Sequence, residues 1–142
     1  MQLDDHARAL IGSGANATLV TLNPDGSPQL SLVWVALDST PDGDELVSAH
    51  LAEHRKVRNV RRDPRVALTI VGTDQGSAMM APYLTITGTA RIVEGGAPEL
   101  LHELTTALAP AYADAFPPAG APAGFLTRIR IDKVGGVGPW AS

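Results

Sequence analysis

Alternating apolar and polar positions predict β-strands along most of the chain. Two runs rich in Val, Leu and Thr, residues 17–22 and 28–37, flank the sequence NPDGS, whose Pro and Asp-Gly are typical of a hairpin turn. A second turn sequence, residues 39–44, leads into a third strand over residues 45–51. Three successive strands joined by short turns indicate an antiparallel meander.

The second half of the chain has the same period. Strands are predicted at residues 65–72, 82–93 and 125–134, and Gly88 interrupts the alternation in the way that is typical of a β-bulge. The Gly-rich residues 135–142 are expected to be irregular.

Three helices are expected between these strands. Residues 3–12 form the first, residues 54–62 the second, which ends at Asp63-Pro64, and residues 98–109 the third, where leucines recur every four positions. The chain thus has about six strands and no β-α-β alternation. We expect a mainly β fold, a six-stranded antiparallel barrel with flanking helices.

The composition bounds the class of protein. The chain has 142 residues, of which 44% are hydrophobic, which suits a single domain over residues 1–142. It has no cysteine, which excludes disulfides, thiolate metal sites and a cysteine nucleophile. The N-terminus lacks the features of a signal peptide, and no apolar run approaches the roughly 20 residues of a membrane span, so we expect a cytoplasmic protein without membrane contact.

The cations are concentrated in one segment. The net charge is −4, which argues against a nucleic-acid partner. Yet six of the 11 Lys and Arg residues lie within residues 55–65, which indicates a local anion site or an interface. These six residues are Arg55, Lys56, Arg58, Arg61, Arg62 and Arg65.

Two positions in this segment differ from the rest. Arg55 and Lys56 stand at the start of the expected helix, where free backbone N–H groups and the helix dipole favour a phosphate group. Arg61, Arg62 and Arg65 fit solvated cations on a helix face equally well.

Other catalytic motifs are absent or misplaced. His50 to His54 match H-x-x-E-H, but His50 ends an expected strand, so the two imidazoles would not share a helix face, and we expect no metal site. The sequence has neither a P-loop nor a G-x-S-x-G elbow.

The order of these segments resembles a known family. The strand pair around NPDGSPQLSLVWVAL, the basic RKVRNVRRDPR and the strand YLTITGTARIV follow one another as in the pyridoxamine-phosphate-oxidase-like split-barrel proteins. Within that family the chain is most similar to the small actinobacterial deazaflavin-dependent reductases, which use coenzyme F420. The resemblance covers residues 5–140, and RKVRNVRRDPR is its most specific part.

The resemblance implies a homodimer with two cofactor sites at the subunit interface. The second strand would run along the ring of the cofactor, the third would end beside its ribityl-phosphate portion, and Arg55 and Lys56 would bind the phosphate. The implied cofactor-binding residues are Gln29, Leu30, Ser31, Leu32, Val33, Trp34, Ser48, Ala49, His50, Arg55, Lys56, Arg58 and Asn59.

The implied reaction is hydride transfer between F420 and a small organic acceptor. No clear counterpart of the residues that hold pyridoxamine phosphate is present, which argues against pyridoxamine oxidation. The alternatives are an FMN-binding oxidoreductase of the same fold and a non-catalytic protein that binds a cofactor or a tetrapyrrole.

The remaining details of the site stay open in the sequence. His50 and Tyr83 are candidate proton donors beside solvent, and Trp140 is a candidate for closing the site. Residues 73–81 and 114–124 are expected to shape the acceptor pocket.

Overall fold

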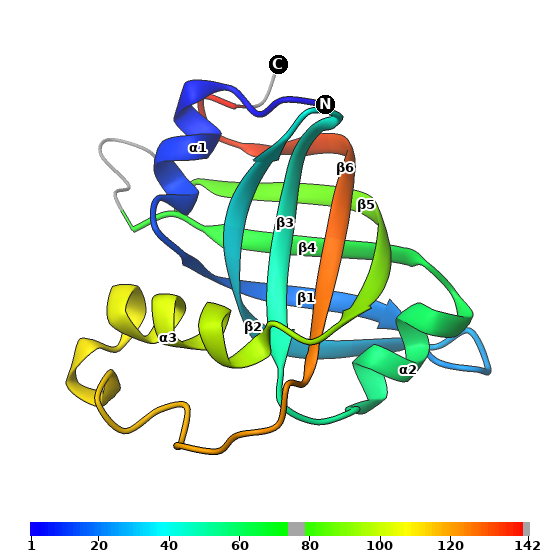
Figure 1. Ribbon diagram of the computed structural model, residues 1–142. Coiled ribbons are helices and arrows are strands. Elements are labelled where there is room, and N and C mark those ends of the chain that lie inside the picture. Colours follow the sequence, from blue (N-terminus) through cyan, green and yellow to red (C-terminus); the bar gives the residue numbers. More distant parts are fainter. Residues whose placement is uncertain (74–78, 141–142) are drawn as a thin grey trace.

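The fold is a closed six-stranded β-barrel with helices at its ends (Figure 1). The computed structural model describes residues 1–73 and 79–140. The strands close in the order β1-β2-β3-β6-β5-β4, and every neighbouring pair is antiparallel. The elements are α1 (Asp5–Ile11), β1 (Ala15–Leu22), β2 (Pro28–Thr40), β3 (Gly43–His50), α2 (Arg55–Arg62), β4 (Arg65–Val71), β5 (Tyr83–Glu94), α3 (Ala97–Leu108), η1 (Pro110–Tyr112) and β6 (Phe125–Val137). This confirms the mainly β class, the meander of the first three strands and the three helices.

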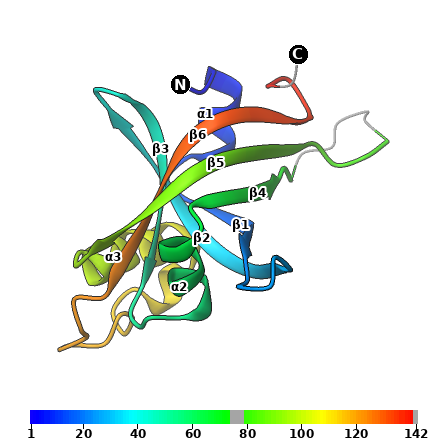
Figure 2. The same cartoon turned by 90° about the vertical axis from the view of Figure 1, so that its right-hand side faces the viewer.

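The barrel interior holds the hydrophobic core. Leu19, Leu46, Leu84 and Ile129 point inward from four different strands and are almost fully buried, as the two-residue period of a strand requires. Helix α1 lies at one end of the barrel, whereas α2 and α3 lie together at the other (Figures 1 and 2). No helix within residues 1–73 and 79–140 is long and apolar enough to cross a membrane.

One sequence expectation about the C-terminal region is wrong. Residues 135–137 are not irregular, because β6 continues to Val137 and pairs there with Tyr83 to Thr85 of β5. Gly135 and Gly136 have low strand propensity, so the sequence did not indicate a strand here. The strand forms because these residues pair with β5. Residues 141–142 of the expected tail lie outside the described residues.

The predicted irregularity at Gly88 is confirmed. The register of β5 and β6 shifts between Thr87 and Gly88, and the extra residue, Asp132, lies in β6. A Cβ atom on Gly88 would collide with the backbone carbonyl of Arg130 and lie 2.8 Å from Cγ2 of Ile129. Only glycine therefore allows the two strands to approach so closely at this point.

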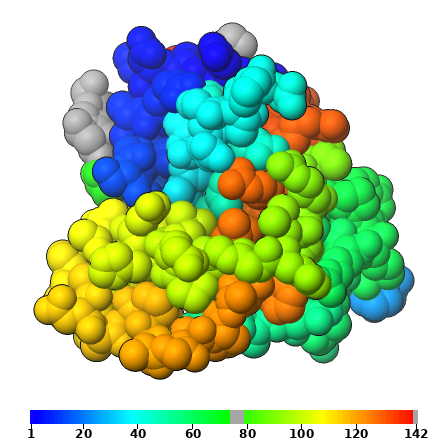
Figure 3. All heavy atoms as spheres, in the orientation of Figure 1, coloured from blue at the N-terminus to red at the C-terminus, as the bar shows by residue number. Residues whose placement is uncertain are grey.

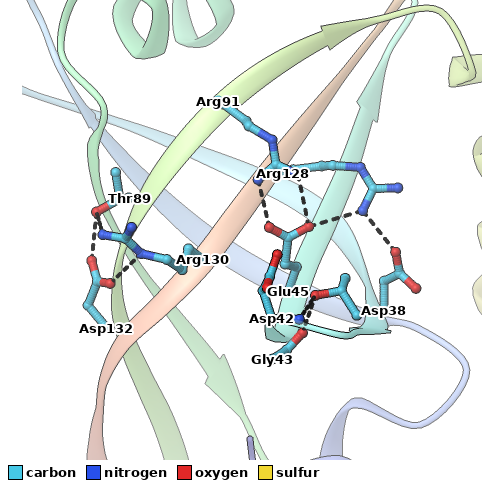
Figure 4. Close-up of polar contacts among 10 residues, drawn as sticks. Asp38, Asp42, Gly43, Glu45, Thr89, Arg91, Arg128, Arg130 and Asp132 are labelled. Atoms are coloured by element: carbon cyan, nitrogen blue, oxygen red, sulfur yellow. Dashed lines mark hydrogen bonds and ion pairs between the residues drawn. The ribbon is translucent and has the colours of Figure 1, made fainter. Parts of the chain in front are cut away.

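The outer surface of the barrel divides into two faces of different composition. We call the first the uncharged face, and it consists of Asn16, Thr18 and Val20 on β1, Leu30, Leu32 and Trp34 on β2, Ala67, Thr69 and Val71 on β4, and Tyr83, Thr85 and Thr87 on β5. We call the second the charged face, and it consists of Asp38, Glu45, Thr89, Arg91, Arg128, Arg130 and Asp132, from β2, β3, β5 and β6 (Figure 4). Strand β5 contributes to both, and it changes from one to the other at Gly88.

A candidate ligand pocket at the end of the barrel

A cleft of about 260 Å³ lies where β2, the end of β3 and the start of α2 meet. Apolar side chains make up much of its lining, while imidazole, hydroxyl and ammonium groups come from the end of β3 and the start of α2, a mixture that is typical of small-molecule sites. The lining residues are Leu32, Val33, Trp34, Ser48, Ala49, His50, Leu51, His54, Lys56, Leu101 and Phe116.

Strand β2 gives the pocket its connection to the uncharged face. Leu32 and Trp34 belong to both the pocket lining and the uncharged face, and the Leu32 side chain is 72% exposed. Gln29, Leu30 and Ser31, at the start of the same strand, do not line the pocket. The pocket therefore opens toward the uncharged face.

The end of β3 places a buried imidazole beside the pocket. His50 is 4% exposed, and its Nε2 atom lies 2.9 Å from the hydroxyl oxygen of Thr127 on the neighbouring strand β6. Burial, and to a lesser extent the positive charges of Lys56 and His54, lowers the pKa of His50 to about 4. The imidazole is therefore neutral near pH 7 and offers a hydrogen bond there rather than an imidazolium charge.

Lys56 is a half-buried cation at the pocket wall. Burial lowers the pKa of its ammonium group, because a charge is poorly solvated there. No hydrogen bond or ion pair joins Lys56 to any other residue in the described part of the chain. An anion in the pocket would relieve this desolvation, so the ammonium group is suited to binding one.

The other cations and polar residues predicted in this segment are engaged elsewhere or face away. Arg55 is exposed and does not line the pocket. Arg58 donates to the carbonyl oxygen of Glu53 at 2.7 Å. The buried amide of Asn59 donates to Thr21 and Asn23 at 3.1 and 3.0 Å, which fastens α2 to β1 and its turn.

The H-x-x-E-H match does not form a helical pair. As the sequence predicts, His50 ends a strand, and His54 stands at the N-cap of α2. Their rings are 6.4 Å apart and nearly perpendicular.

Tyr83 and Trp140 lie away from this pocket in the same chain. His50 pairs with Phe125 at the first residue of β6, whereas Tyr83 pairs with Val137 at its last residue, so most of a 13-residue strand separates them. The indole Nε1 of Trp140 donates to the carbonyl oxygen of Tyr83 at 2.9 Å. Neither residue lines the pocket of its own chain.

Four lining residues were missed by the sequence interpretation. Leu51 and His54 directly follow the implied segment that ends at His50, and their proximity was the signal. Leu101 belongs to the leucine pattern of α3, where it reads as a core residue. Phe116 lies within the expected shaping loop 114–124, but nothing in the sequence singles it out. Residues 74–78 of the other expected loop lie outside the described residues.

A larger cavity of about 500 Å³ adjoins the charged face, but both arginines that line it are already paired with carboxylates. Arg91 donates to Glu45 at 2.6 Å, and Arg130 donates to Asp132 at 2.9 Å (Figure 4). Hydrogen bonds from Arg91 lower the pKa of Glu45, so this carboxyl group is firmly ionised. The smaller pocket is the better candidate for ligand binding, because the ammonium group of Lys56 has no partner among residues 1–73 and 79–140.

Barrel and cleft together define a split-barrel protein with a candidate small-molecule site where β2, β3 and α2 meet. Residues 3–138 match the pyridoxamine 5'-phosphate oxidase family, and the chain belongs to this family, which includes oxidoreductases and binds flavins or related cofactors.

Solved structures share the fold at low sequence identity. An F420 reductase is 23% identical with a TM-score of 0.69, covering 90% of this chain and 94% of its own. A protein from Listeria innocua that bears the name pyridoxamine 5'-phosphate oxidase is 20% identical with a TM-score of 0.67, and the match covers 93% of this chain and 95% of that one. The heme storage protein HutZ from Vibrio cholerae is 18% identical with a TM-score of 0.58, covering 97% and 96%.

Proposed function

We propose that this protein is an F420-dependent oxidoreductase that transfers a hydride between the deazaflavin cofactor and a small organic acceptor. The observation that carries the proposal is the half-buried ammonium group of Lys56 beside an apolar cleft, without a bonded partner in the described residues. A flat ring with an anionic substituent matches this combination. The F420 reductase of the same fold supports the choice of cofactor.

The pocket residues fit such a ligand in their chemistry. Leu32 and Trp34 offer apolar surface to one part of it, and Lys56 offers a charge-assisted hydrogen bond to its phosphate. When bound, the reduced deazaflavin would supply a hydride from its ring C5 to an electrophilic C=C or C=N carbon of the acceptor. The neutral His50 imidazole would orient a polar group, and solvent would supply the proton.

We also propose that the protein acts as a homodimer through the uncharged face. The cleft of one chain, about 260 Å³, is below the roughly 300–1,000 Å³ that small-molecule pockets occupy, so a whole cofactor needs a further wall. Leu30, Leu32 and Val71 are each more than 60% exposed on that face. A second copy would cover these side chains and complete the pocket at Leu32 and Trp34, and it would bring Tyr83 toward the partner's site.

Paired titrations test the choice of cofactor. The purified protein is titrated with F420, FMN and hemin, and quenching of Trp34 and Trp140 fluorescence is followed. Tight binding of F420 alone, followed by turnover of an acceptor with the reduced cofactor, is the expected result. Preference for FMN would replace the proposed cofactor, and failure of both flavin-type ligands would remove the proposed function.

A tetrapyrrole-binding role is the second candidate, and one observation favours it. Neutral imidazoles are common ligands of heme iron, and His50 and His54 both line the pocket. A strong Soret band with hemin that is lost in His54→Ala, together with no F420 binding, would support this role. The first candidate is preferred because Nε2 of His50 is already engaged by Thr127.

A further inference from the structure

The segment between α3 and β6 supplies an aromatic ring to the pocket. Residues 109–124 run below α3 along the lower edge of the molecule, coloured yellow to orange in Figure 3. Phe116 in this segment lines the pocket and is still 38% exposed. A large apolar side chain that is left partly exposed at the edge of a cleft is available to a ligand.

The segment is held by backbone hydrogen bonds at its C-terminal end and within. The N–H groups of Gly95 and Ala97 donate to the carbonyl oxygens of Gly124 and Ala123 at 2.8 and 3.0 Å. Nearer to the ring, the N–H group of Phe116 donates to the carbonyl of Tyr112 at 2.9 Å. These bonds fasten the segment to the start of α3 and turn the chain at Phe116.

Gly124 joins the segment directly to the pocket. Its φ is +65°, and a Cβ atom there would collide with the carbonyl oxygen of His50 and lie 2.6 Å from Cβ of Ala97. The end of the segment thus packs against the same strand end that supplies His50 to the pocket. This contact fixes the position of the segment relative to β3.

Phe116 and Lys56 define a ligand with two different parts. The apolar lining comes from Leu32 and Trp34 on β2 and from Leu101 and Phe116 on the α3 side, while Lys56 carries the positive charge. We propose that Phe116 is a specificity-determining residue, whose ring forms the wall against which the flat aromatic part of an anionic ligand lies. The inference rests on the proposed function only for the identity of that ligand.

The test uses anthraquinone-2-sulfonate, a flat aromatic anion, as the probe. Its binding is followed by quenching of Trp34 fluorescence in a Trp140→Phe background, so that only the tryptophan of the pocket reports. We expect Phe116→Ala to weaken binding about fivefold to tenfold, because part of one phenyl contact is lost. Phe116→Tyr, which keeps a flat ring and adds no tryptophan, is expected to bind within about twofold of the parent.

Tyr112→Ala is the matched control, because Tyr112 lies in the same segment, is 66% exposed and does not line the pocket. The inference would be overturned if Phe116→Ala bound the probe as tightly as the parent, or if Phe116→Ala and Tyr112→Ala lost equal affinity. It would also be overturned if the parent protein did not bind the probe. Melting temperatures show whether Phe116→Ala is folded. If it is not, Phe116→Leu takes its place, with a smaller expected loss of affinity for the probe.

A parallel titration with F420 separates the two proposals. If the affinity for anthraquinone-2-sulfonate depends on Phe116 but F420 does not bind, the proposed function is wrong and the proposed role of Phe116 stands. Tight binding of F420 that is unaffected by Phe116→Ala, Phe116→Leu and Phe116→Tyr would support the proposed function and overturn the proposed role of Phe116.

Discussion

The two outer faces of the barrel use their polar groups in opposite ways. On the charged face, Glu45 is 8% exposed and accepts hydrogen bonds from both Arg91 and Arg128, and Arg128 also donates to Asp38 at 2.8 Å (Figure 4). On the uncharged face, hydroxyl, methyl and isobutyl groups stand side by side, with Leu32 72% exposed. The same sheet therefore satisfies its own charges on one side and leaves apolar area open on the other.

This difference shows where each face finds its stabilising interactions. Ion pairs among exposed side chains neutralise charge within one chain and need no partner. Exposed apolar side chains gain free energy only when another surface removes them from water. The pocket lies at the edge of the open face, which connects ligand binding to association in the proposed dimer.

The largest expected effect comes from a charge on the uncharged face. Leu32→Glu would place a carboxylate where the proposed dimer buries an apolar side chain, and we expect the mass to change from twice 14.8 kDa to 14.8 kDa. Light scattering after size exclusion measures it. Val93→Glu is the control, because Val93 lies on β5 beyond Gly88 and outside the uncharged face, and this variant should remain a dimer. A wild-type protein that is monomeric at micromolar concentration would contradict the proposed interface.

The pocket end of the barrel should lose stability in mild acid. The folded-state pKa of His50 is about 4 and the unfolded value is 6.5, so the unfolded state binds more protons between these pH values. The stability is fully present above pH 6.5 and falls by up to about 3 kcal/mol as the pH drops to 4. Urea unfolding from pH 7 to 4 measures it, and His50→Gln should remove most of the slope. An equal slope in the variant would assign the effect to other groups.

Removing the ammonium group of the pocket should weaken the ligand rather than the fold. Lys56→Ala is expected to cost about 1.5–3 kcal/mol of F420 binding, as for one charge-assisted hydrogen bond, and to leave the melting temperature nearly unchanged. Fluorescence titration measures the dissociation constant. Lys133→Ala, an exposed lysine outside the pocket, provides the comparison. An unchanged constant in Lys56→Ala would rule out this group as the anion-binding residue.

The smallest effect is expected on the charged face. Glu45→Gln weakens the pairs with Arg91 and Arg128, which are partly exposed, so we expect about 1 kcal/mol of destabilisation at pH 7. Since the folded-state pKa of Glu45 is lowered, this contribution is present above its unfolded pKa and is lost as the pH falls through the folded value. Urea unfolding at pH 7 and pH 2.5 should show the difference only at pH 7. Asp42→Asn is the control, and a larger effect there would point away from Glu45.

The sequence predicted the strands and helices well because their signals are local. The alternation of the strands, the leucines of α3 and the Asp-Pro after α2 each depend on neighbouring residues. The strand over residues 135–137 was missed because its partner, the start of β5, lies about 50 positions earlier in the chain.

The pocket was anticipated in part for the same reason. Ser48 to His50 and Lys56 are close in sequence, so a resemblance over a short motif includes them. Asn59 lies in the same motif, yet its amide bonds to Thr21 and Asn23 of another strand, which no local pattern reveals. Phe116 lines the pocket from a segment whose last residue, Gly124, packs against the end of β3, and this contact joins residues that are distant in the chain.

The sequence alone determined the alternating strands, the helices and the cluster of cations after the third strand, since these follow from the order of residue types along the chain. Tertiary structure decided which of those cations lines the cleft, which residues form the uncharged face and which aromatic ring outside the strands lines the cleft. Each of these depends on residues that are distant in the chain and meet only when the barrel closes, and burial and pairing energies are set at that contact.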